Sequence, residues 1–567
     1  MKKIISLSLL LISIYSCKQD NKLDLLILNG DYYTASAGSD AVSAIGISNG
    51  IISYVGDIDN AQKLISDSTK IIDAAGKFVM PGFIEGHGHF SGLGASLQNL
   101  NFLKDTSWQV IVQKVQKKAE TAKEGEWIYG RGWHQEKWKL QPDEYLSDYP
   151  THQSLSEVSP DNPVLLVHAS GHSLFANEKA MNLAGISNET ADLKGGKIIR
   201  DNSGNAIGVF EERAMTPIKA AYNEYLEKLD AESQAMIWYE SIELAQQECL
   251  KNGITSFQDA GSLFYELDRY TEMAEQGKLE IRLWAMMRDS LAKSPKPIAE
   301  YRKIDVGNGH FTCRAIKSEI DGALGAHGAW LLEPYDDKQG FYGQNTTEIS
   351  TVKDIAKIAY ESNMQLCMHA IGDRANKETL DIIESYHSKS AEDLRWRVEH
   401  AQHLSPTDIQ RFKSTGAIAS MQGVHCTSDA PFVQRRLGLL RSKIGAYAWK
   451  ALLDQGVKIV NGTDVPVEVL DPIENFYASV TRKRLDNGME FFVENRMSRE
   501  QALRSYTIDA AYGAFQDNNK GSLEIGKYGD IVILDKNLLT CDDLEIPRTN
   551  ITHTIVGGKI LYTNNTK

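Results

Sequence analysis

The middle of this chain repeats one pattern: a short β-forming run ends on a residue that can ligate a metal or carry a proton, and a helical pattern follows. The runs are 253–259, 366–369, 397–400 and 457–464, and they end on Asp259, His369, His400 and Asp464. Strands that alternate with helices pair in parallel. Functional residues at many strand ends are typical of an α/β fold of the TIM-type (β/α)8 barrel kind, whose active site lies at the carboxyl ends of its strands. The alternative is an open doubly wound sheet, which would concentrate its site at one switch point.

Apolar runs near both ends of the chain predict a second, smaller unit. The runs are 23–28, 44–47, 51–55 and 71–72 on one side and 530–535 and 554–561 on the other. Turn dipeptides such as Asn29-Gly30 separate them, as in hairpins. We expect a small β-sandwich domain built from residues 17–80 together with residues 515–567, which flanks a barrel over residues 81–514.

The segment from about residue 100 to residue 250 is longer than one strand-helix unit requires. It contains an aromatic-rich stretch, 127–134, and a glycine-rich stretch, 193–208. We expect it to be an insertion after the first barrel strand that shapes a substrate pocket. The sequence does not define its fold.

The composition predicts a large hydrophobic core, and the net charge argues against a nucleic-acid partner. The 567 residues are enough for two or three packed units, and 42% of them are hydrophobic, so the chain has ample material for a large core. The formal net charge is −14 at pH 7, and no basic run interrupts it. Because nucleic-acid binding needs a concentrated basic surface, we expect no nucleic-acid partner.

The N-terminal segment has the layout of an export signal. Met1-Lys2-Lys3 is cationic, and residues 4–14 are apolar apart from serines but too few to span a bilayer. Ser16 directly precedes Cys17, and a polar run follows, which resembles a bacterial lipoprotein signal. We therefore expect residues 1–16 to be removed and Cys17 to be acylated, so that a lipid anchor tethers the exported chain to the cell envelope. The alternative is an ordinary secretory signal with an incidental cysteine.

A His-x-His pair is the first candidate metal-binding feature. His87 and His89 follow the apolar run that begins near Met80, and residues two apart on a strand face the same side. Imidazole is a good ligand for zinc and similar ions. Further candidates end later strands in the order lysine, histidine, histidine, aspartate. These are Lys317, His369, His400 and Asp464.

This order resembles the binuclear sites of the amidohydrolase superfamily, and longer segments narrow the resemblance. The segments are 167–172, 320–325, 369–375 and 424–429. They are similar to the amidohydrolase-3 branch, which includes N-substituted formamide deformylases and is more distantly related to D-aminoacylases. The resemblance covers essentially the whole mature chain. Glu85 stands where aspartate is commoner and Thr463 where serine is commoner, and neither departure removes a ligand.

The resemblance implies two divalent metal ions, with zinc favoured. His87, His89 and Asp464 would hold one ion, and His369 and His400 the other. Lys317 would bridge the two ions as an N6-carboxylated side chain, because a carbamate offers the oxygens that a protonated amine lacks. The alternatives are an ion pair of Lys317 with Glu319 or Asp321, and histidines that merely fill the core.

Roles for the remaining candidates follow from the same resemblance. Asp464 would be catalytic, because it can accept a proton from the attacking hydroxide and deliver it to the leaving nitrogen. His168 and His172 would contact substrate, and His172 would also be catalytic as a second polarising group. The alternative for His168 is a buried structural residue. Asp321, Asp373 and Glu399 would orient the ligands. Weaker candidates are Glu211, Glu212 and His425.

The expected function is hydrolysis of carbon–nitrogen bonds other than peptide bonds, in an N-acyl, N-formyl or cyclic small-molecule amide, by a metal-bound hydroxide. Two alternatives stay open. One is a mononuclear deaminase- or esterase-like hydrolase, and the other is a lipoprotein that binds a ligand without turning it over. The sequence leaves the substrate, the identity of the metal and the formation of a homo-oligomer open.

Overall fold

The computed structural model describes residues 22–36, 42–102, 105–133, 135, 138, 145–146, 149–168, 173–193, 196–288, 294, 296–325 and 327–564. The predicted signal peptide, Cys17 and His172 lie outside the described residues.

Eight parallel strands form a barrel. Around the barrel they follow chain order: β7 (Phe83–Gly88), β16 (Ile254–Ser262), β17 (Arg282–Met287), β19 (Phe311–Glu319), β20 (Gln365–Ala370), β21 (Arg397–His400), β22 (Ile418–Gln422) and β23 (Ile459–Gly462). The first and last strands meet just beyond β23, where the amide of Asp464 donates to the carbonyl of His87 at 2.7 Å. A Cβ at Gly462 would overlap the backbone of His87, so the absence of a side chain permits this close approach. The predicted barrel is confirmed, and the open-sheet alternative is wrong.

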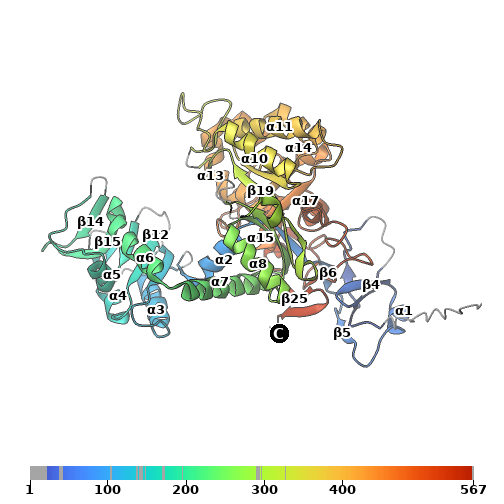
Figure 1. Ribbon diagram of the computed structural model, residues 1–567, viewed down its shortest axis with the longest axis horizontal. Helices are drawn as coiled ribbons and strands as arrows, with labels where there is room; N and C mark the ends of the chain where they lie inside the picture. Colours follow the sequence, from blue (N-terminus) through green and yellow to red (C-terminus); the bar gives the residue numbers. More distant parts are fainter. Residues whose placement is uncertain are drawn as a thin grey trace, which may run out of the picture.

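Helices cover the outside of the barrel (Figure 1). Those that follow the strands are α2 (Phe90–Gln98), α8 (Phe264–Glu275), α10 (Ile349–Glu361), α11 (Asp373–His387), α12 (Pro406–Thr415), α13 (Gly423–Gly445) and α15 (Pro472–Thr481). Their apolar stripes pack on the strands; Leu380 and Ile383 of α11, for example, join the main core. Among the described residues, no helix combines the length and the apolar character needed to cross a membrane.

Both ends of the chain build one β-sandwich. One sheet has the order β4-β3-β1-β5, from Ile51–Gly56, Ala44–Ser48, Leu25–Leu28 and Lys70–Asp73. The other has the order β2-β6-β24-β25-β26, from Asp31–Tyr32, Phe78–Pro81, Ile531–Leu534, Ile551–Val556 and Lys559–Thr563. Ile27 and Ile45 of the first sheet share a core with Val79, Ile531 and Ile533 of the second. The composite sandwich predicted from the sequence is confirmed.

The insertion after the first barrel strand has a sheet of its own. Its order is β14-β15-β13-β12-β9-β8, from Gly196–Arg200, Ala206–Glu212, Ser173–Ala176, Val164–His168, Ile128–Trp133 and Leu100–Asn101. Along β12, Val164 and Leu166 face one apolar cluster while Leu165 and Val167 face another, so the sheet is buried on both sides. Figure 1 shows this unit at one flank of the barrel, beyond α2 and the long helix α7 (Ala231–Lys251).

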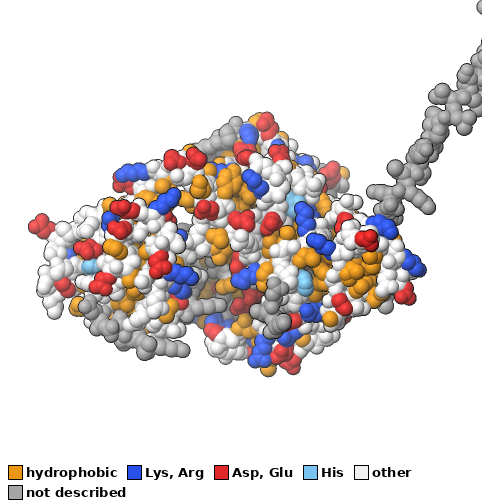
Figure 2. Space-filling model, turned by 90° about the horizontal axis from the view of Figure 1, so that it is seen from below, with side chains coloured by type: hydrophobic (Ala, Val, Ile, Leu, Met, Phe, Trp, Pro, Cys, Tyr) orange, Lys and Arg blue, Asp and Glu red, His pale blue; other side chains and the backbone are white. Residues whose placement is uncertain are grey.

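The surface carries interspersed charges. On the face drawn in Figure 2, acidic and basic side chains alternate over short distances, and apolar side chains lie in small groups between them. This mixture agrees with a composition that is 24% charged.

Candidate metal centre

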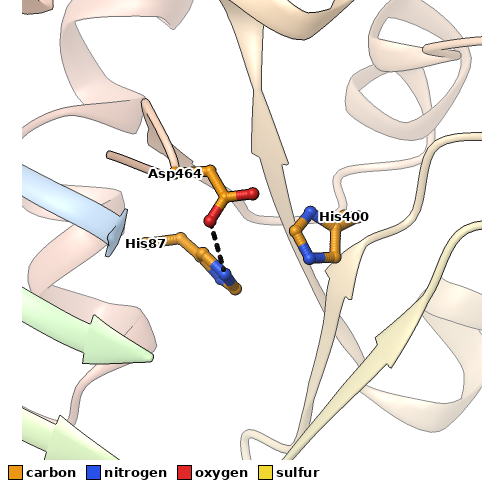
Figure 3. A group of neighbouring side chains, drawn as sticks. All are labelled: His87, His400 and Asp464. Carbon is orange, nitrogen blue, oxygen red and sulfur yellow. Dashed lines mark ion pairs between the residues drawn. The ribbon is translucent and has the colours of Figure 1, made fainter. Parts of the chain in front are cut away.

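Six predicted ligands lie at or near the carboxyl ends of barrel strands. His87 is in β7 and His89 follows it; Lys317, His369 and His400 lie in β19, β20 and β21; Asp464 follows β23. Parallel strands in a barrel all end at the same face, so residues far apart in the chain converge there. Figure 3 shows three of them, His87, His400 and Asp464, turned toward one another.

Asp464 stands at the centre of one half of the cluster. Its Oδ1 lies 3.6 Å from Nε2 of His87 and 3.3 Å from Nε2 of His89. One ligand atom each from His87, His400 and Asp464 lies within 4.8 Å of the others, and all three residues are buried. Three such groups within this span can surround a single cation.

The other half of the cluster contains two histidines and the lysine. The ring centroids of His369 and His400 are 4.5 Å apart, and those of His87 and His400 are 4.7 Å apart. Nζ of Lys317 lies 3.5 Å from Nε2 of His87. The structure thus brings all six predicted ligands into one connected group.

Glu319 and Asp321, the alternative partners of Lys317, are engaged elsewhere. Glu319 pairs with Arg288 at 3.0 Å. Asp321 accepts hydrogen bonds from the backbone amides of Trp330, Ile371 and Gly372, each at 2.8 or 2.9 Å. Asp321 therefore anchors the turn that follows His369. Asp373, which was expected to orient a ligand, accepts a hydrogen bond from the backbone amide of Leu332 at 2.8 Å.

Two acceptors fix the orientation of the ligand histidines. Oε2 of Glu399 lies 2.5 Å from Nδ1 of His87, and Arg397 holds Glu399 through hydrogen bonds of 2.7 and 3.0 Å. Oε1 of Gln422 lies 2.9 Å from Nδ1 of His400. Because each Nδ1–H donates to these oxygens, the Nε2 atoms carry the lone pairs that a cation needs.

The electrostatics also suit a cation. Burial lowers the pKa of His87 to about 4 and that of His369 to about 3, so both imidazoles are neutral near pH 7. Burial alone would raise the pKa of Asp464, but His89, His87 and His400 outweigh it and hold that pKa well below the usual range. Neutral imidazoles beside an ionised carboxylate are the protonation states in which these groups ligate metals.

Two ligand atoms lack a hydrogen-bond partner among the described residues. These atoms are Nε2 of His369 and Oδ1 of Asp464, and both are buried. A buried polar atom without a partner is costly, and a cation at the cluster would satisfy both atoms. The residues present therefore fit a metal centre.

Two of the predicted residues of the insertion, His168 and Glu211, lie in the sheet that the insertion forms. His168 ends β12, where its ring centroid is 4.6 Å from that of Trp133. Glu211 accepts a hydrogen bond from the hydroxyl of Tyr149 at 3.0 Å. Both belong to the separate sheet of the insertion, and the side chain of Glu212 lies outside the described residues.

Three residues at the site were either missed or given only a minor role when the site was predicted from the sequence. Arg397 and Gln422 were missed, and His425 was only a weak candidate, yet its Nε2 lies 3.9 Å from Oδ2 of Asp464. A usable signal existed for Arg397 and Gln422, because both are polar residues in short strand-forming runs, and the structure buries every residue of both strands. Buried polar side chains need partners, so such positions point toward a network.

The sequence pattern of the Amidohydrolase family matches residues 70–562. Protein LONG AFTER FAR-RED 3 of Arabidopsis thaliana is 30% identical over 558 residues, which cover 95% of this chain and 91% of the relative. N-substituted formamide deformylase of Arthrobacter pascens is 26% identical over 550 residues, covering 95% and 98%. The crystal structure of an uncharacterized metal-dependent hydrolase from Pyrococcus horikoshii matches with a TM-score of 0.72 at 26% identity, covering 92% of this chain and 99% of that one. These findings confirm the resemblance noted in the sequence: the chain belongs to the Amidohydrolase family and is a hydrolase.

Proposed function

We propose that this protein hydrolyses carbon–nitrogen bonds other than peptide bonds in small N-acyl, N-formyl or cyclic amides. The observation that carries the proposal is the buried cluster of neutral histidines around the ionised Asp464 at the carboxyl face of the barrel. The similarity to a protein named for formamide deformylation supports this substrate class.

We assign the ligands as the residue order suggests. His87, His89 and Asp464 would hold one divalent ion, His369 and His400 would hold a second, and zinc would suit the imidazole donors. When bound, the ions act as Lewis acids that polarise the substrate carbonyl and lower the pKa of water.

Lys317 is the proposed bridge between the two ions. Burial lowers the pKa of Lys317, which favours the free amine. The free amine can attack carbon dioxide, forming an N–C bond and releasing one proton, to give a carbamate with two oxygens. Nζ lies 3.5 Å from Nε2 of His87, and this position supports a carbamate that would join the ligands.

Asp464 is the proposed proton carrier. Its carboxylate accepts the proton released when water adds to the acyl carbon, and it returns that proton to the departing nitrogen. The products are a carboxylic acid and an amine. The position of its Oδ1, 3.6 Å from Nε2 of His87 and 3.3 Å from Nε2 of His89, supports this role.

Metal content per chain, measured with amine release from N-substituted formamides and N-acyl compounds, tests the proposal. We expect two ions in the zinc-loaded wild type and fewer in Lys317→Ala, with loss of turnover. Lys251→Ala is the matched control, since Lys251 pairs with Glu248 on the exposed face of α7. One ion in every variant, with Lys317→Ala active, would instead favour a mononuclear deaminase- or esterase-like enzyme. Metal binding without turnover of any amide or ester would leave the ligand-binding alternative.

We also propose that the chain is exported and anchored through an acylated Cys17, on the sequence pattern alone. The expected result is that wild type partitions into detergent and Cys17→Ser into the aqueous phase. Equal partitioning of the two proteins would contradict the anchor.

A further inference from the structure

His425 is a buried histidine beside the centre that the ligand set does not use. It lies in the first turn of α13, directly after β22, and its side chain is 8% exposed. Its ring is nearly parallel to that of His400, with centroids 6.2 Å apart. It therefore faces the same space as the ligands, from the end of β22, one of the strands that contribute none of them.

The neighbours of His425 define its tautomer. Nε2 of Gln402 donates to Nδ1 of His425 at 3.1 Å. An imidazole nitrogen that accepts a hydrogen bond carries no proton, so the neutral ring bears its proton on Nε2. This arrangement is the reverse of that in His87 and His400, whose Nδ1 atoms donate and whose Nε2 atoms carry lone pairs. Gln402 thus makes His425 a donor rather than a ligand.

The donor has no acceptor among the described residues. Nε2 of His425 is buried without a hydrogen-bond partner. The nearest carboxylate oxygen, Oδ2 of Asp464, is 3.9 Å away, which is beyond hydrogen-bonding distance. The opposite oxygen of the same carboxylate, Oδ1, faces His87 and His89. An N–H group that is buried, oriented and unpaired next to the proton carrier suits an acceptor that arrives with the substrate.

We propose that His425 is a catalytic residue whose Nε2–H donates a hydrogen bond to the acyl oxygen of the substrate as that oxygen becomes negative. This inference rests on the proposed amide hydrolysis and adds to it the side chain that stabilises the oxyanion.

The chemistry requires no change in the protonation of His425. As water oxygen bonds to the acyl carbon, the π electrons of the carbonyl move onto its oxygen, and Asp464 takes the released proton. The hydrogen bond from Nε2–H strengthens as this charge grows, which stabilises the transition state more than the bound amide. When the carbonyl re-forms, the carbon–nitrogen bond breaks, and the nitrogen receives the proton from Asp464.

Substitutions of His425 distinguish an oxyanion donor from a metal ligand or a residue that only supports the fold. In His425→Leu we expect kcat to fall by roughly 10²–10³-fold, the usual loss for one oxyanion donor, with KM changed only a few-fold and the metal content unaltered. His425→Gln, which keeps an N–H donor of similar reach, should recover part of kcat. His310→Gln is the matched control, because His310 precedes β19 at the opposite end of the barrel and contacts the carbonyl of Ile281.

Two measurements do not depend on turnover. Binding of a phosphonamidate, whose tetrahedral oxygens mimic the oxyanion, should weaken in His425→Leu by the same factor as kcat/KM, while amine product binding stays unchanged. Nitrogen NMR of histidine-labelled protein should show one neutral Nε2–H ring that disappears in His425→Leu.

The outcomes distinguish the two proposals. If wild type hydrolyses no amide but phosphonamidate binding still requires His425, the substrate class is wrong and the donor role stands. Loss of metal in His425→Leu would make the residue a ligand and overturn the inference. Full activity in that variant, or an Nδ1–H tautomer, would also overturn it.

Discussion

Glu399 accepts a hydrogen bond from Nδ1 of His87 at 2.5 Å, although the two residues are 312 positions apart in the chain. Burial alone would raise the pKa of Glu399, but Arg397 and His87 outweigh it and hold that pKa well below its usual range. The carboxylate is therefore charged in a fully buried site, where it aligns the ring of His87 and increases its basicity.

Glu399→Gln tests this alignment. An amide in place of the carboxylate removes the charged acceptor beside Nδ1 of His87 and the negative charge that pairs with Arg397. We expect the affinity for zinc to fall roughly 10–100-fold, the range for such supporting contacts. Titration with a competing chelator measures it. Glu384→Gln serves as the control, since Glu384 pairs with Arg411 at the surface; an unchanged affinity in Glu399→Gln would refute the alignment.

Asp464→Asn tests the proton carrier. Asparagine keeps one oxygen toward His87 and His89 but cannot accept and return a proton. We expect kcat to fall by roughly 10²–10⁴-fold, the range for general acid–base catalysis, with a smaller loss of metal. Steady-state kinetics with metal analysis on the same sample checks both. Asp454→Asn, at an exposed pair with Lys450, should behave as wild type. A fully active Asp464→Asn would disprove the role.

Metal removal should destabilise the fold. The cluster holds neutral rings and an ionised carboxylate in the folded chain only, so an ion that binds them stabilises that state. At free zinc 1,000 times Kd we expect a gain of about 4 kcal/mol in the free energy of unfolding. Thermal unfolding before and after chelation, with and without zinc, measures the shift. His87→Ala should show no zinc-dependent shift at the same concentration, and an equal shift in that variant would place the ion elsewhere.

Lys520 should make stability depend on pH. Burial lowers the pKa of Lys520 to about 7 from an ordinary value of 10.5. The unfolded chain then binds one more proton than the folded chain between these values, so stability rises with pH from about 7 to about 10.5. The slope from this residue is about 1.4 kcal/mol per pH unit. Denaturant unfolding of wild type and Lys520→Met across this pH range measures the contribution of Lys520 to this slope. Identical slopes in both proteins would rule out a buried, neutral lysine.

Local sequence patterns were sufficient to predict the barrel and the face at which the candidate ligands meet, whereas their roles as metal ligands are what the resemblance implied. Alternation of strands and helices implies parallel pairing, and the two-residue period of a strand places His87 and His89 on one side. Because parallel strands end at one face, Lys317, His369, His400 and Asp464 could be expected to meet there. Each of these inferences needs only the residues within one strand and the rule for joining strands.

Contacts between strands required the tertiary structure. The Arg397–Glu399–His87 chain, the pairing of Gln422 with His400 and the contact of Gln402 with His425 join residues from different strands and loops. Which nitrogen of an imidazole bears the proton depends on the group that happens to lie beside it in space. The same is true of the insertion, whose sheet pairs strands that are not consecutive in the chain, such as β9 with β12 and β13 with β15. The sequence therefore identifies the residues that carry the chemistry, whereas packing decides how each one is oriented and protonated, because hydrogen bonds and burial act across space rather than along the chain.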